Sequence, residues 1–118
     1  MADVLERLTS MVETTANEVI ALEGRLGYVD SDSEAVSAWL GDVLEFVSVA
    51  ECSSATGEWL PAGWRVLLSF GGPNLWVEGR TGSGSVEVSG HWGSESVTRF
   101  AYVPALADII AEFIEVAR

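Results

Sequence analysis

The stretch WRVLLSFGGPNLWVEGRTGSGSVEVSGHWGSESVTRFAYV, residues 64–103, decides the fold, because apolar and polar residues alternate along it between short glycine-rich turns. Alternation with a period of two is typical of strands that bury one face. The pattern predicts four strands, at residues 64–70, 75–80, 85–92 and 96–103. Since only three or four residues separate consecutive strands, we expect antiparallel neighbours in a four-stranded meander.

An amphipathic helix is predicted over residues 3–23, where apolar residues recur at steps of three and four. The stripe consists of Leu5, Leu8, Val12, Val19, Leu22 and Leu26, with Thr15 in its one gap. Gly24 or Gly27 is expected to end this helix. The stripe predicts packing against the rest of the chain, although so regular a seam could also pair with a second copy and form a homodimer.

A second helix is predicted to begin at residues 30–34, where Ser31 can cap and Glu34 can complete a capping box. Gly41 would cost this helix about 1 kcal/mol relative to alanine, so we expect close packing or a weak point there. Residues 1–50 are therefore expected to be helical and residues 51–63 to form a connecting loop. The predicted apolar set is Val36, Trp39, Leu40, Val43, Leu44 and Val47.

A C-terminal helix is predicted over residues 104–118, because Pro104 suits the first turn of a helix. Its apolar face holds Leu106, Ile109, Ile110, Phe113, Ile114 and Ala117. The predicted fold is thus one α+β domain over residues 1–118, with two N-terminal helices, a four-stranded antiparallel meander (residues 64–103) and a C-terminal helix packed on one face of the sheet. Of the five tryptophans, Trp39 and Trp64 are expected in the core, and Trp59, Trp76 and Trp92 lie near predicted loops.

The chain carries 18 acidic residues against six arginines and no lysine, for a net charge of −12 on 118 residues. Such a surface repels nucleic acids and anionic lipids, so we expect no direct contact with DNA or a membrane. No apolar run approaches the ~20 residues that span a bilayer, and the N-terminus lacks the basic segment of a signal peptide. We therefore expect the protein to be located in the cytoplasm.

Catalytic chemistry finds little support in the sequence. His91 stands alone beside Trp92, without a Gly-x-Ser-x-Gly elbow, and Cys52 is the only cysteine, so neither an internal disulfide nor a Cys/His zinc site can form. Two of the eighteen acids could meet as a catalytic pair, but nothing in the sequence selects a pair. We expect no catalytic residue, no cofactor and no metal.

The candidate binding residues are acids on two predicted helices. Asp108, Glu112 and Glu115 recur at steps of four and three opposite the apolar face of the C-terminal helix, and Asp42 and Glu45 lie on the polar side of the second. We expect these five acids to form a negative surface for a basic partner. The three C-terminal acids span about 10 Å at the helical rise, which is too sparse to copy duplex DNA at one charge per ~1.7 Å. A DNA mimic would need Asp42 and Glu45, or Glu6 and Glu13, to converge with the C-terminal helix. Faster docking onto a basic groove requires only a negative surface, without the spacing of phosphates.

The acidity has plainer explanations as well, namely solubility or adaptation to salt. The turn at residues 71–74 adds a second candidate patch, because Asn74 and the nearby Trp76 could contact a partner. The plainer interpretation is an ordinary hairpin turn.

The stretch VLLSFGGPNLW at residues 66–76, followed by Val86, Val88 and GHWG at residues 90–93, resembles short accessory proteins of phages and integrative elements. Some small acidic proteins of this kind resemble anti-CRISPR and anti-restriction inhibitors in size and charge. The similarity covers about residues 64–93, contains no catalytic motif and transfers no site residue. It implies a non-enzymatic inhibitor, encoded by a phage or mobile element, that occupies the basic surface of a nucleic-acid-processing complex such as a CRISPR effector in a bacterial host. The alternative is a small acidic ligand-binding or immunity-type accessory protein with a pocket on its sheet.

Overall fold

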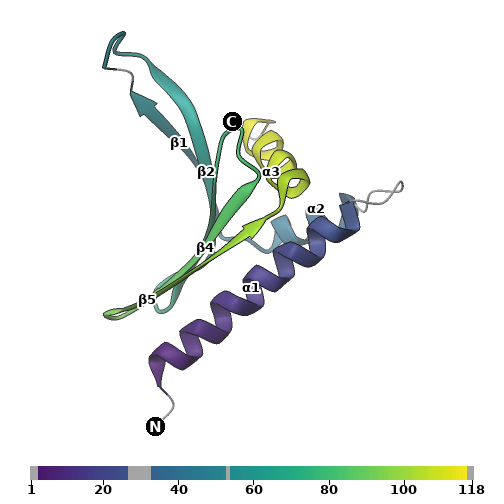
Figure 1. The fold of residues 1–118 in the computed structure, drawn as a ribbon, viewed down its shortest axis with the longest axis vertical. Coiled ribbons are helices and arrows are strands. Elements are labelled where there is room, and N and C mark those ends of the chain that lie inside the picture. The colour runs from purple at the N-terminus through teal and green to yellow at the C-terminus, as the bar shows by residue number, and fades with distance from the viewer. Residues whose placement is uncertain (1–2, 27–32, 53, 117–118) are drawn as a thin grey trace.

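The computed structural model describes residues 3–26, 33–52 and 54–116 and has an α+β architecture, with helices packed on a twisted antiparallel sheet (Figure 1). Its sheet has five strands in the order β1-β2-β3-β4-β5, and each strand pairs antiparallel with the next. The elements are α1 (Val4–Leu26), α2 (Ser33–Gly41), β1 (Glu45–Cys52), β2 (Trp59–Ser69), β3 (Asn74–Arg80), β4 (Ser85–Trp92), β5 (Glu95–Tyr102) and α3 (Pro104–Val116).

The segment after α2 differs from its prediction. The expected four-stranded meander is present as β2 to β5, but residues 45–52 add β1 to it, so the helical assignment up to residue 50 is wrong. Residues 43–49 hold apolar residues at spacings that suit either period, and the β-branched Val47 and Val49 favour the strand. The predicted loop at residues 51–63 shortens accordingly, because β2 already begins at Trp59.

Helix boundaries also differ in part from the predictions. Gly24 lies inside α1 instead of ending it, and Gly41 is the last residue of α2, with no atom close enough to contact an added Cβ. Gly27 and the proposed cap Ser31 lie outside the described residues. The start of α3 at Pro104 is confirmed.

The core lies between α1, α3 and one face of the sheet. Val66, Val77 and Val88 face one another on β2, β3 and β4, and each has 0% of its surface exposed. Gly90 lets α1 approach the sheet, because a Cβ there would meet Leu8 Cδ1 at 2.7 Å and Val12 Cγ2 at 2.9 Å. The apolar stripe of α1 is therefore buried within the chain from Leu8 onward, so the seam considered for a homodimer already packs on β4 and β5.

Two tryptophans and a glutamate complete this packing. Trp64 and Trp39 are buried as expected, and Trp64 lies over Gly79, where a side chain would collide with its ring. The carboxylate of Glu23 in α1 accepts hydrogen bonds from the backbone N–H groups of Ala105 (3.2 Å) and Leu106 (2.7 Å). A negative charge at the start of α3 satisfies unpaired N–H groups and complements the helix dipole.

The opposite face of the sheet is not covered by the helices. Figure 1 shows α1 and α3 on the same side, while the hairpin of β1 and β2 extends away from both. Every described residue of β1 is exposed or half-buried. We call the uncovered side the open face, and it consists of the residues that alternate with the core residues along each strand.

Candidate functional site

The register of the sheet brings five residues into one row across the open face. Their Cα positions are paired from strand to strand, so their side chains point to the same side. This row, which we call the central row, runs from β1 to β5 through Val47, Arg65, Glu78, Glu87 and Phe100.

The two glutamates of the central row differ in their partners. Glu78 pairs with Arg65, whose Nη2 lies 3.2 Å from Oε1 of Glu78. Glu87 lies directly opposite Glu78 on β4 and has no ion-pair partner among the described residues. Because like charges directly opposite each other destabilise a strand pair, this position adds a local electrostatic cost to the sheet.

Aromatic stacking supports the arginine of the row. The guanidinium of Arg65 lies over the Trp76 ring, 5.2 Å from its centroid, and the His91 ring stacks against Trp76 at 4.8 Å with an interplanar angle of 10°. Trp76, predicted as a contact residue, is thus half-buried in a stack that crosses three strands. The other residue predicted at this tip, Asn74, closes the turn, because its Oδ1 accepts a hydrogen bond from the Gly71 N–H at 2.9 Å.

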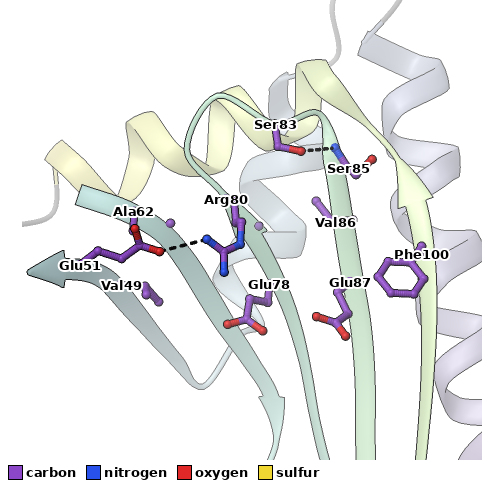
Figure 2. A pocket seen from close by; sticks show the side chains of 12 residues that line it. Val49, Glu51, Ala62, Glu78, Arg80, Ser83, Ser85, Val86, Glu87 and Phe100 are labelled. Atoms are coloured by element: carbon purple, nitrogen blue, oxygen red, sulfur yellow. Dashed lines mark hydrogen bonds and ion pairs between the residues drawn. The ribbon is translucent and has the colours of Figure 1, made fainter. Parts of the chain in front are cut away.

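A hollow of about 290 Å³ opens beside the central row (Figure 2). In Figure 2 the carboxylates of Glu78 and Glu87 and the ring of Phe100 project from neighbouring strands on the same side. Arg80 and Glu51 border the hollow and form an ion pair at 3.0 Å. With 77% of the Arg80 side chain exposed, solvent screens this pair and it contributes little stability.

A second hollow, of about 230 Å³, adjoins the first on the helix side. The two share Arg80 and Ser83, and the second is also lined by Asp108 and Glu112 of α3. We call the surface formed by both hollows the acidic end. Five carboxylates and one arginine, Arg80, line the two hollows and leave a net charge of −4 there. The carboxylates are Glu51, Glu78, Glu87, Asp108 and Glu112. Arg65 lines neither hollow but pairs with Glu78 from the next strand.

The five predicted acids are distributed over several surfaces. Asp108 and Glu112 belong to the acidic end, but Asp42 lines a separate hollow between α1 and α2. Glu45 lies on β1, where it alternates with the core-facing Phe46 and so points to the open face. The side chain of Glu115 lies outside the described part of the structure.

The residues of the central row were missed by the sequence argument, although one signal for them was present. Alternation along the predicted strands already separates Arg65, Glu78 and Glu87 from the core residues. The register between strands cannot be read directly from the sequence, and it is the register that brings these three side chains together.

The described residues offer no metal centre, because no three of their His, Cys, Asp or Glu side chains come together as ligands. Within the same part of the chain, the His91 side chain has its stacking contact and no hydrogen bond to a nucleophile. Cys52 is exposed near the end of β1. Within residues 3–26, 33–52 and 54–116, no helix is both long enough and apolar enough to span a membrane.

Comparison of the chain with protein-family models, curated proteins and solved structures found no match in any of the three.

Proposed function

We propose that this chain acts by binding, as a non-enzymatic inhibitor of the anti-CRISPR kind, encoded by a phage or mobile element and directed at a nucleic-acid-processing complex of a bacterial host. The observation that carries the proposal is the acidic end, where carboxylates of β1, β3, β4 and α3 surround two adjoining hollows. A concentrated negative surface on a folded scaffold attracts the lysine- and arginine-lined groove of a nucleic-acid enzyme and speeds docking there.

The arrangement of charges favours docking over close mimicry of DNA. Two arginines lie among the carboxylates of the open face, and each forms an ion pair with one of them. A phosphate backbone carries only negative charge at regular spacing. We therefore propose a surface complementary to one basic protein patch, which needs a few well-placed carboxylates instead of a continuous line of them.

A reconstituted cleavage assay tests this proposal. The purified chain, added to a CRISPR effector or a restriction endonuclease with its DNA substrate, should inhibit cleavage with saturation at a fixed molar ratio to the enzyme. Inhibition should weaken as salt rises from 50 to 300 mM, because the Debye length falls from roughly 14 Å to below 6 Å. A variant reversed at three acids of α3 (D108K/E112K/E115K) should inhibit less. Undiminished inhibition by this variant at all salt concentrations would contradict the proposed surface.

A second candidate function is binding of a small molecule, and the hollow on the open face favours it. At about 290 Å³ the hollow lies at the lower end of the sizes typical of ligand pockets. Its carboxylates would select a cationic ligand. A thermal-shift screen separates the candidates, since stabilisation by a small cation without any effect on nucleases would support the accessory-protein alternative.

A further inference from the structure

We infer that the hollow on the open face receives an arginine side chain of the partner, with its guanidinium placed between the carboxylates of Glu78 and Glu87 and the ring of Phe100. The inference rests on the proposed function, because it names the group on the basic partner that the acidic end would bind. It also divides the acidic end into a recognition site on the sheet and a flanking charge on α3.

The chain itself shows how an arginine binds to this sheet. Arg65 contacts a carboxylate on the next strand, Glu78, and places its guanidinium over an aromatic ring of that strand, Trp76. Charge-assisted hydrogen bonding and a cation–π contact are both satisfied in this arrangement. The Arg65 side chain is 42% exposed, and its Nε is buried without a hydrogen-bond partner among the described residues, so the carboxylate and the ring are the two groups that hold the guanidinium.

The other half of the central row repeats the same two groups without a cation. Glu87 has no ion-pair partner among the described residues, and its neighbour on β5 is Phe100, a residue that is 73% exposed. An incoming cation would remove the repulsion between Glu78 and Glu87, which lie opposite each other. It would also cover an aromatic surface that otherwise faces solvent. Charge complementarity and the unused ring therefore point to the same ligand.

Arginine fits these groups better than lysine. Two carboxylates on adjacent strands and one ring can be engaged together by a planar group with several N–H donors, whereas an ammonium is a point charge with a compact hydration shell. The hollow is open along the sheet face, so a side chain projecting from a protein surface can enter it (Figure 2).

Fluorescence anisotropy with labelled hexa-arginine as the probe tests the inference. The E78Q/E87Q variant should bind the peptide about tenfold more weakly than the wild type, which corresponds to the loss of about 1.4 kcal/mol. The matched control, D108N/E112Q, also removes two negative charges, but from the adjoining hollow, and should weaken binding less than about threefold. Hexa-lysine should bind the wild type more weakly than hexa-arginine does.

Two further variants keep the test independent of folding. E87Q leaves the Arg65–Glu78 pair intact and should still weaken binding several-fold, and F100L should do so without any change in charge. Unchanged circular dichroism and unfolding midpoints identify folded variants.

The outcomes separate the inference from the proposed function. If the wild type fails to bind hexa-arginine at 50 mM salt, the proposed basic partner and the arginine site both fail. If the wild type binds and E78Q/E87Q and D108N/E112Q weaken binding equally, or if F100L binds as the wild type does, the arginine site fails while the acidic binding surface stands.

Discussion

The two faces of the sheet are built from the same five strands, and yet alternate residues along these strands serve opposite purposes. On the covered face Val66, Val77 and Val88 form a fully buried row beneath the helices. On the open face the neighbouring row places Arg65, Glu78 and Glu87 in or near solvent. One residue along each strand separates an apolar contact from a charged one.

The two faces differ in the electrostatic cost that each can tolerate. Apolar burial on the covered face stabilises the fold and leaves no room for a charge. The open face contributes little to that burial, so an unfavourable pair such as Glu78 and Glu87 costs only a fraction of the total stability there. We infer that binding is concentrated on the face that the core does not need.

The largest expected effect comes from weakening the covered face. Leu8→Ala should lower the free energy of unfolding by about 3 kcal/mol, because the side chain is fully buried between α1 and the sheet at Gly90. Urea denaturation measures the change. Leu5→Ala on the same helix is the control and should cost less than about 1 kcal/mol, since Leu5 is 39% exposed. Equal losses in the two variants would show that α1 does not pack as described.

A smaller effect is expected where the Glu23 carboxylate of α1 binds the start of α3. Glu23→Ala should cost about 1 to 2 kcal/mol, because it leaves the N–H groups of Ala105 and Leu106 without their acceptor. Glu18→Ala, an exposed position on the same helix, should change stability by no more than about 0.5 kcal/mol. Amide hydrogen exchange at Ala105 and Leu106 should accelerate only in the Glu23 variant.

The smallest effects on stability are expected within the open face, from substitutions of Glu78 and Glu87. Either substitution relieves the repulsion between Glu78 and Glu87. Glu78→Gln also breaks the ion pair with Arg65 and should cost up to about 0.5 kcal/mol, whereas Glu87→Gln breaks no pair and should raise stability by about a few tenths of a kcal/mol. Thermal unfolding at low salt measures both. Destabilisation of similar size in the two variants would mean that Glu87 has a favourable partner, which would contradict an unpaired carboxylate in the central row.

Most of the fold could be predicted from the sequence, because α1, β2 to β5 and α3 each show a clear period and start or end at a turn or proline. β1 could not, since the apolar spacing after Gly41 suits a helix or a strand, and the weak strand preference of Val47 and Val49 becomes decisive only through pairing with β2. The role of Glu23 could not be predicted either, because its partners lie 82 and 83 positions further along the chain.

The candidate site was less accessible to sequence reasoning than the fold. Helical spacing in the sequence groups Glu45 with the acids of the predicted helices. In the structure Glu45 lies on a strand, β1. Asp108 and Glu112 line the same hollow, yet the position of Glu78 and Glu87 at the acidic end depends on strand register. A glutamate in a strand pattern shows which face it occupies but not what lies beside it.

The most direct test of the account is a ¹⁵N chemical-shift titration of the wild-type chain with hexa-arginine, because it locates the binding face residue by residue. The account predicts the largest shifts at the backbone amides of residues 78–80, 85–88 and 100, with small changes along α1. Largest shifts along α1 and α3, with the amides of β3 and β4 unmoved, would contradict the claim that the open face of the sheet is the binding surface.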